Sequence, residues 1–230
     1  MPIASCLCPS RVSAFAYGVR RHSGNAFIAL ILSTTAVAAE PVTVVALGDS
    51  LTAGYGLPEG EGFVPQLQKW LDAKGAEAVV VNAGVSGDTS AGGLARLDWS
   101  LTPDTDALIV ALGGNDLLRG LDPAITRDNL DAILTSADGR DLPALLIGLP
   151  GPTNYGIEWK EQFDAIFPDL AKKHGALIEP NFMAGIGGGE PEAMRPYLQA
   201  DGIHPSAEGV SRIVAQLGPR VLELIERAKP

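Results

Sequence analysis

Short apolar runs alternate along this chain with longer segments of helical hydrophobic periodicity. Five runs are predicted to be strands, because they are rich in β-branched and other apolar residues and are bounded by polar or glycine-containing segments. They span 42–47, 79–82, 108–112, 145–149 and 176–178. Helical patterns lie between and after them, at 64–74, 90–99, 123–137, 158–174 and about 205–227. Continuous apolar strands indicate burial on both faces, so we expect an α/β doubly wound fold with a parallel sheet between two layers of helices.

The first 39 residues have the composition of an export signal. They contain no acidic residue and three basic ones, Arg11, Arg20 and Arg21. The apolar stretch that follows is about 14 residues long, shorter than the roughly 20 residues that a membrane-spanning helix needs. We therefore expect residues 1–39 to be a signal peptide that is cleaved before Glu40, leaving no stable membrane anchor. This interpretation predicts a periplasmic or secreted bacterial protein.

Residues 40–230 are predicted to form a single domain, because no repeat, linker or low-complexity segment interrupts them. Both cysteines, Cys6 and Cys8, precede this domain, so we expect it to contain no disulfide. Without the first 39 residues, 14 of the 17 basic residues remain against 27 acidic ones, a net charge of −13. Such a charge disfavours nucleic acid or an anionic membrane surface as the main partner. We expect a monomer whose partner is a small-molecule substrate.

Polar and glycine-rich segments follow four of the five predicted strands. They span 48–50, 82–89, 113–116 and 150–155. Ligands of open parallel sheets bind beyond the carboxyl ends of the strands. We therefore expect these four loops to meet at one edge of the sheet and to form a site.

Ser50 and His204 are the candidate nucleophile and base of that site. A serine hydroxyl needs a neighbouring base before it can attack a carbonyl carbon. Ser50 follows the first predicted strand at a turn that begins with Gly48, and Asp201 lies three residues before His204, where its carboxylate can orient the imidazole. The alternatives are a helix cap at Ser50 and a structural imidazole at His204. The combination of the three residues favours catalysis.

Ser86 and His174 are less suited to the same two roles. Ser86 follows Gly84 and precedes Gly87, but the Gly-x-Ser-x-Gly spacing of a nucleophile elbow is not met. His174 follows two lysines and precedes Gly175, a pattern typical of a helix C-terminus. We interpret His174 as structural.

Three groups in the predicted loops are candidate donors to the oxyanion that forms during acyl transfer. They are the backbone N–H groups of Ser50 and Gly87 and the side-chain amide of Asn115. Glycine at position 87 permits close approach of a substrate. The alternative for Asn115 is an ordinary turn residue, because Gly-Asn-Asp is common in turns.

Four blocks of the chain together resemble the SGNH/GDSL hydrolase family. The blocks are Gly48-Asp49-Ser50-Leu51, Ser86-Gly87-Asp88-Thr89, Gly113-Gly114-Asn115-Asp116 and Asp201-Gly202-Ile203-His204-Pro205, and they occur in the family's order. The segments 86–90, 92–97 and 115–120 are most similar to the bacterial periplasmic group of acyl-CoA thioesterase I, arylesterase and lysophospholipase.

The resemblance implies a flavodoxin-like, three-layer α/β/α domain around a five-stranded parallel sheet, with no metal and no cofactor. It implies Ser50 as nucleophile, His204 as general base and Asp201 as the partner that orients it. It also implies that Ser50, Gly87 and Asn115 form the oxyanion hole. In this group a substrate loop follows the asparagine, here at 116–121. The candidate substrate-contacting residues are therefore Asp116, Leu117, Leu118, Leu121 and, from the fourth loop, Tyr155.

The expected activity is hydrolysis of carboxylic esters and thioesters, such as aryl esters, acyl-CoA and lysophospholipids, through an acyl-enzyme. A carbohydrate acetyl esterase on the same scaffold is an alternative, although the leucines at 117, 118 and 121 favour acyl chains. A third hypothesis is a metal-dependent phosphohydrolase or a non-catalytic binding module. It would use Asp49, Asp116, Asp201 and His204, because carboxylates suit hard metal ions.

Overall fold

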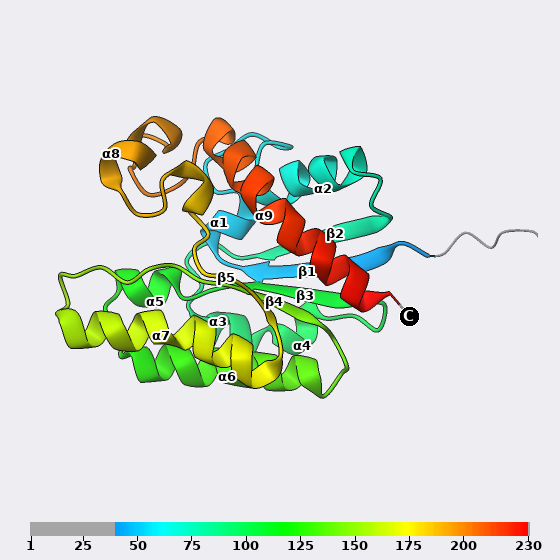
Figure 1. The fold of residues 1–230 in the computed structure, drawn as a ribbon, viewed down its shortest axis with the longest axis horizontal. Helices are drawn as coiled ribbons and strands as arrows, with labels where there is room; N and C mark the ends of the chain where they lie inside the picture. Colours follow the sequence, from blue (N-terminus) through cyan, green and yellow to red (C-terminus); the bar gives the residue numbers. More distant parts are fainter. Residues whose placement is uncertain (1–39, 230) are drawn as a thin grey trace, which may run out of the picture. The chain divides into compact units, whose positions relative to one another are not determined.

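A computed structural model describes residues 40–229, which contain one five-stranded parallel sheet (Figure 1). The strand order is β2-β1-β3-β4-β5. The strands are β1 (Val42–Gly48), β2 (Ala78–Gly84), β3 (Ala107–Ala111), β4 (Ala144–Ile147) and β5 (Leu177–Glu179). This order is that of flavodoxin-like doubly wound folds, in which the winding direction reverses between β1 and β3. The predicted α/β class and the five-stranded parallel sheet are confirmed.

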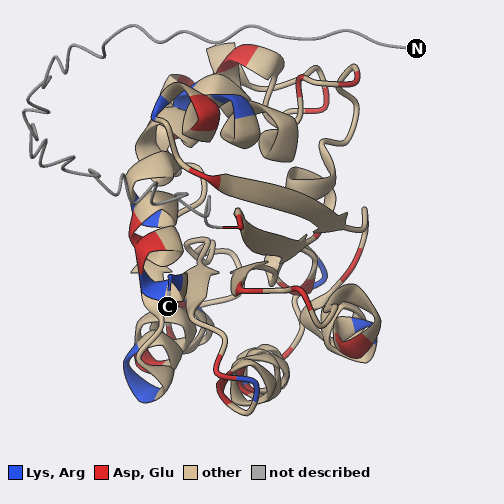
Figure 2. Cartoon of the chain, turned by 90° about the vertical axis from the view of Figure 1, so that its right-hand side faces the viewer, with Lys and Arg blue, Asp and Glu red and all other residues tan. Residues whose placement is uncertain are grey.

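Helices cover both faces of the sheet and separate two apolar cores (Figure 1). One layer contains α2 (Phe63–Ala73) and α9 (Ala207–Ala228), and the other contains α3 (Ser90–Ala95), α4 (Leu97–Ser100), α6 (Pro123–Asp138) and α7 (Ile157–His174). Successive residues of a strand point to opposite faces, so Leu108 and Ile109 fill different cores. Charged residues lie on the helices and loops and are nearly absent from the strands (Figure 2). Because both faces of these strands are apolar, the sheet packs against the helix layers on both of its sides.

Strand β2 differs from the prediction that every strand is buried on both faces. Among the strands of residues 40–229, it lies at the edge of the sheet and pairs only with β1. Ala78 and Val80 pack into the core with α2, whereas Val79 and Val81 are 46% and 41% exposed. The prediction was wrong for this strand, because an apolar run does not reveal that a strand lies at the edge of its sheet.

Several short helices were not predicted from the sequence. They are α1 (Ser50–Ala53), α5 (Gly114–Leu118), α8 (Pro191–Met194) and the 3₁₀ turns η1 (Ala184–Ile186) and η2 (Arg195–Tyr197). None exceeds five residues, which is too short to show a helical period. The helix expected over 90–99 is divided at Arg96, whose φ of −109° and ψ of 7° leave the helical region.

Within residues 40–229, no helix is long and apolar enough to cross a membrane. The predicted signal peptide at 1–39 and both cysteines lie outside the described residues. Export, signal cleavage and the extent of the mature domain stay predictions.

His174 joins the C-terminal half of α6 to the end of α7. Its Nδ1 lies 2.6 Å from Asp138 Oδ2 and its Nε2 lies 2.7 Å from Asp131 Oδ1. Burial alone would lower the pKa of His174, but the hydrogen bonds to the two carboxylates outweigh burial and raise the pKa above 6.5. The ring therefore bridges two helices, and the two carboxylates favour its protonated form. Gly175 ends α7 in the left-handed conformation, with φ of 63°.

We expect His174→Gln to lower the free energy of unfolding by about 1 kcal/mol at pH 6 and by less at pH 9. The folded-state pKa of His174 is raised, so its stabilisation is complete below the unfolded value of 6.5 and is lost as pH rises through the folded value. Urea unfolding of the wild type and the variant at both pH values measures this difference. Lys173→Met is the control, since Lys173 bonds to the same Asp131 but is not the group whose pKa is raised. A difference that grows with pH would contradict the assignment.

Candidate active site

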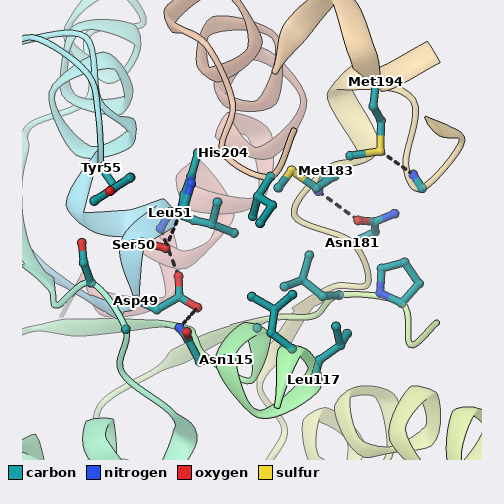
Figure 3. Close-up of a pocket in the computed structure, with 18 residues that line it drawn as sticks. Asp49, Ser50, Leu51, Tyr55, Asn115, Leu117, Asn181, Met183, Met194 and His204 are labelled. Atoms are coloured by element: carbon teal, nitrogen blue, oxygen red, sulfur yellow. Dashed lines mark hydrogen bonds between the residues drawn. The ribbon is translucent and has the colours of Figure 1, made fainter. Parts of the chain in front are cut away.

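Ser50 is the first residue of α1, directly beyond the carboxyl end of β1. The helix is capped by Asp49, whose Oδ1 accepts a hydrogen bond of 3.0 Å from the backbone N–H of Leu51. Ser50 is thus not the cap that was considered as its alternative role. Its hydroxyl group is directed instead toward His204 (Figure 3).

Two glycines allow α1 to lie against the ends of the strands. A Cβ at Gly48 would lie 2.0 Å from Thr52 Oγ1, and a Cβ at Gly84 would lie 2.3 Å from the backbone nitrogen of Ala53. Neither glycine has a positive φ. The glycine before Ser50 is therefore required by close packing of α1 rather than by an unusual backbone angle.

Ser50, His204 and Asp201 form a hydrogen-bonded chain, although Ser50 and His204 are 154 residues apart in the sequence. His204 Nε2 lies 2.8 Å from Ser50 Oγ, and His204 Nδ1 lies 2.7 Å from Asp201 Oδ2. A carboxylate beside Nδ1 favours the imidazole tautomer whose proton is on Nδ1. This tautomer leaves Nε2 unprotonated and able to accept the serine proton. The arrangement has the geometry of a nucleophile, a base and an orienting carboxylate.

Asp201 is held ionised by the loop that it starts. Its Oδ1 accepts hydrogen bonds from the backbone N–H groups of Ile203, at 2.9 Å, and His204, at 3.0 Å. The Ile203 N–H and then the His204 ring lower the pKa of Asp201 to about 2. The carboxylate therefore stays charged at neutral pH and fixes the position of the imidazole.

Neighbouring groups hold the loop and the ring of His204 in place. The ring of Tyr55 packs on the imidazole with a centroid distance of 4.6 Å and an interplanar angle of 41°. The side-chain amide of Gln199 donates to the backbone oxygens of Tyr55, at 2.8 Å, and Pro205, at 3.0 Å. Gln199 thus links the segment after α1 to the loop that carries His204. Neither Tyr55 nor Gln199 was singled out from the sequence, because no local pattern marks such long-range contacts.

The three predicted oxyanion donors border one cavity. Asn115, on α5, donates its side-chain amide to the backbone oxygen of Asp88 at 2.9 Å and to Asp49 Oδ2 at 3.4 Å. Among the residues that the structure describes, the backbone N–H groups of Ser50 and Gly87 have no protein acceptor. Gly87 has a φ of 88° and open space around its Cα, so glycine is required there for its backbone conformation.

Arg96 fixes the relative position of the two loops that carry Ser50 and Gly87. Its guanidinium donates to the backbone oxygen of Gly48 at 2.9 Å and to that of Ala83 at 2.8 Å, at the ends of β1 and β2. It also forms an ion pair of 2.6 Å with Asp88. Sequence reasoning did not assign this function to Arg96, because an arginine within a helical segment resembles an ordinary surface cation.

Asp49 is a buried carboxyl group between Ser50 and Asn115 (Figure 3). Burial raises its pKa to about 6, and the hydrogen bond from the Leu51 N–H offsets only part of this effect. Its role as helix cap and as acceptor for Asn115 was not predicted. Asp49 belongs to the block of residues 48–51 that resembles the family, but only the fold shows which groups its carboxyl contacts.

A cavity of about 400 Å³ opens beside Ser50 and has mainly apolar walls (Figure 3). Its apolar lining residues are Leu51, Leu117, Leu118, Leu149, Pro150, Met183, Met194 and Ile203. Of the substrate-contacting residues predicted from the sequence, Leu117 and Leu118 lie in this lining. The methionines were missed because they come from the irregular segment between β5 and α9, where no periodicity indicates which side chains turn inward.

The other three predicted substrate-contacting residues do not line this cavity. Asp116 is buried and accepts hydrogen bonds from Ser90 and Thr126. The Leu121 backbone oxygen accepts a hydrogen bond from Trp159 on α7, and the Tyr155 hydroxyl donates to the backbone oxygen of Leu118. The structure therefore places Asp116, Leu121 and Tyr155 behind or beside the cavity wall, where they support the loop after Asn115.

We expect Asp116→Ala to lower the free energy of unfolding by about 3 kcal/mol, because it leaves the buried N–H of Ser90 without an acceptor. Asp116→Asn keeps one oxygen acceptor and is expected to cost about 1 kcal/mol. Urea unfolding at pH 7 measures both values. An Asp116→Ala variant as stable as the wild type would show that these hydrogen bonds do not hold the loop.

The residues of the metal hypothesis do not form one metal-binding site. They are Asp49, Asp116, Asp201 and His204. Within residues 40–229, no three His, Cys, Asp or Glu side chains are placed to hold a metal ion together. Asp116 bonds to Ser90 and Thr126, and Asp201 bonds to its own loop and to His204.

Comparison with known proteins places this geometry in a family. Residues 46–212 match the model of the GDSL-like lipase/acylhydrolase family. The chain is 40% identical to the esterase TesA of Pseudomonas aeruginosa over 199 residues, covering 86% of this chain and 96% of that protein. It is 37% identical to the thioesterase 1/protease 1/lysophospholipase L1 of Escherichia coli K12 over 202 residues, covering 86% and 92%.

A solved structure agrees with the sequence comparisons. The crystal structure of AlinE4, an SGNH-hydrolase family esterase, superposes with a TM-score of 0.66 at 42% identity, covering 80% of this chain and 97% of that one. The resemblance of the four sequence blocks is thereby confirmed. The chain belongs to the GDSL-like lipase/acylhydrolase family, whose members are also called SGNH hydrolases.

Proposed function

We propose that this protein is a serine hydrolase that cleaves carboxylic esters and thioesters through an acyl-enzyme. The observation that carries the proposal is the 2.8 Å contact between Ser50 Oγ and His204 Nε2, with Asp201 on the opposite ring nitrogen. Ser50 attacks the carbonyl carbon while His204 takes the hydroxyl proton. His204 then donates that proton to the leaving group, and a water molecule activated by His204 hydrolyses the acyl-serine.

The tetrahedral intermediate places a negative charge on the former carbonyl oxygen. We propose three hydrogen-bond donors to this oxyanion, all of which border the cavity next to the nucleophile. They are the backbone N–H groups of Ser50 and Gly87 and the side-chain amide of Asn115. Donors that are fixed before the reaction stabilise this charge without reorganisation. Arg96 and Asp49 act through these groups. Arg96 holds the Gly48 backbone oxygen and the Asp88 carboxylate, and Asp49 accepts a hydrogen bond from the Asn115 amide.

The substrate class follows from the walls of the cavity and from the relatives. Leucine and methionine side chains dominate the lining, which favours an acyl chain over an acetylated sugar. The names of the two curated relatives, an esterase and a thioesterase/lysophospholipase, support the same class. We propose aryl esters, acyl-CoA and lysophospholipids as substrates of one site.

A panel of p-nitrophenyl esters from two to sixteen carbons, together with an acyl-CoA and a lysophospholipid, tests this proposal. We expect hydrolysis of acyl esters and of the thioester, and both activities lost together in Ser50→Ala. Acetylated sugars turned over faster than all acyl esters would favour the carbohydrate esterase instead. Retention of activity in Ser50→Ala would contradict the mechanism.

We further propose that the protein acts as a monomer outside the cytoplasm, after cleavage of residues 1–39. The basic and then apolar composition of that segment supports export. N-terminal sequencing of protein recovered from the periplasm or the medium is expected to start at Glu40, and light scattering is expected to give the mass of one chain. Retention in the cytoplasm with an uncleaved N-terminus would contradict export.

A further inference from the structure

A second cavity adjoins the one beside Ser50. Its volume is about 630 Å³. Its lining residues are Gly189, Pro191, Met194, Arg195, Leu198, Gln199, Ala200 and Gly202. Gly189 and Met194 border both cavities. The side chain of Met194 therefore forms part of the partition between the active-site cavity and the second one.

Met194 is held in this position by the turn that precedes α8. The backbone N–H of Gly189 donates to Met194 Sδ at 3.2 Å, and Figure 3 shows Met194 on the far side of the cavity from Ser50. Gly187, Gly188 and Gly189 have φ values of 117°, 65° and 119°, a run that L-residues with side chains rarely adopt. These three glycines thus fold the chain back and place the backbone N–H of Gly189 beside the sulfur of Met194.

The contact that holds Met194 is weak and the side chain is adaptable. A thioether sulfur is a weak hydrogen-bond acceptor, and an unbranched methionine changes rotamer readily. A group that pushes against Met194 from the side of Ser50 can therefore displace it at little cost. The space behind it is lined by Pro191, Leu198 and Ala200, whose apolar surfaces suit methylene groups, and also by the polar side chains of Arg195 and Gln199.

We propose that Met194 sets the acyl-chain length that the active site accepts. Short and medium acyl chains fit between Ser50 and Met194, whereas longer chains must displace Met194 and extend into the second cavity. This inference rests on the proposed function, since it assumes that the apolar cavity binds the acyl group. It adds a specificity-determining residue and a second acyl-binding region to that function.

Substitutions at Met194 test the proposal through the ratio of kcat/KM for a twelve-carbon to that for a four-carbon p-nitrophenyl ester. Met194→Ala is expected to raise this ratio about tenfold by opening the partition, and Met194→Phe is expected to lower it by a similar factor. Met194→Leu keeps nearly the same volume without the sulfur acceptor, so it is expected to stay within about threefold of the wild type. Because the ratio compares two substrates on one enzyme, it does not depend on the active fraction of each preparation.

Met183→Ala is the matched control, since Met183 lines the active-site cavity but not the second one. It enlarges the first cavity without joining the two, so we expect it to favour eight-carbon over four-carbon esters and not to increase the preference for twelve or sixteen carbons. If Met194→Ala does not fold, Met194→Phe still tests the partition with a larger side chain, and Met194→Leu is its control of nearly unchanged volume.

Unchanged ratios in both Met194→Ala and Met194→Phe would overturn the inference. That result would leave the proposed function intact as long as wild-type hydrolysis depends on Ser50. Absence of any Ser50-dependent ester hydrolysis in the wild type would instead overturn the proposed function. The two failures are therefore distinguishable in one set of assays.

Discussion

Replacing Ser50 with alanine is expected to lower kcat for ester hydrolysis by about 10⁵-fold while the fold stays intact. The substitution removes the only atom that forms the acyl-enzyme in the proposed mechanism, and Ser50 Oγ makes its described hydrogen bond to His204 rather than to the core. Initial rates on a four-carbon p-nitrophenyl ester measure the loss, and thermal unfolding followed by circular dichroism checks the fold.

Ser86→Ala is the control for this experiment, because Ser86 borders the same cavity and was the competing candidate in the sequence. We expect it to lower kcat by less than about tenfold, since Ser86 has no contact with His204 among the described hydrogen bonds. If instead Ser86→Ala abolished activity and Ser50→Ala did not, the nucleophile would have been assigned to the wrong loop.

Asp201→Asn is expected to lower kcat by about 10³-fold with little change in KM. The carboxylate selects the His204 tautomer and stabilises the imidazolium that forms when Ser50 gives up its proton, and a neutral amide does both poorly. The side chain of Asp201 is 36% exposed, so water partly replaces the lost charge and the effect is smaller than the roughly 10⁴-fold loss at a fully buried site.

A comparison of Asp201→Asn with Asp201→Ala separates charge from loop geometry. Asn retains an oxygen for the backbone N–H groups of Ile203 and His204, whereas Ala does not. We therefore expect Asp201→Ala to be less active than Asp201→Asn and to unfold at a lower temperature. Equal activity of Asp201→Asn and the wild type would show that Asp201 does not orient His204.

The long helices were predictable because their sequences carry a helical hydrophobic period, and the strands because they are continuous apolar runs bounded by polar segments. Each of the five predicted strands overlaps an observed strand, and the long helices α2, α6, α7 and α9 begin and end within a few residues of the predicted limits. Edge position has no such signal, which is why the exposure of Val79 and Val81 was not foreseen. The order of parallel strands depends on packing between segments that are distant in the sequence. The sequence of a single strand therefore does not indicate whether that strand lies at the edge of the sheet.

The site could be predicted only in part. The blocks that contain Ser50, Gly87 and Asn115 follow predicted strands, so we expected them to meet beyond the carboxyl ends of the parallel sheet. His204 follows no strand directly and was assigned from its spacing to Asp201 and its pairing with Ser50. The contacts of Arg96 depend on how the ends of β1 and β2 approach each other, and the contact of Asp49 with Asn115 depends on how the ends of β1 and β3 do. Asp116 was expected to contact substrate, yet burial and its bond to Ser90 direct it into the protein.

The most direct test of the account is to identify the atom that a serine-directed organophosphate modifies. Treatment with diethyl p-nitrophenyl phosphate transfers a diethylphosphoryl group to an activated serine, and peptide mass spectrometry locates the added mass. We predict a single modified residue, Ser50, and strongly slowed labelling in His204→Ala. Modification at another serine, or equal labelling of Ser50→Ala, would contradict the claim that Ser50 and His204 form the reactive pair.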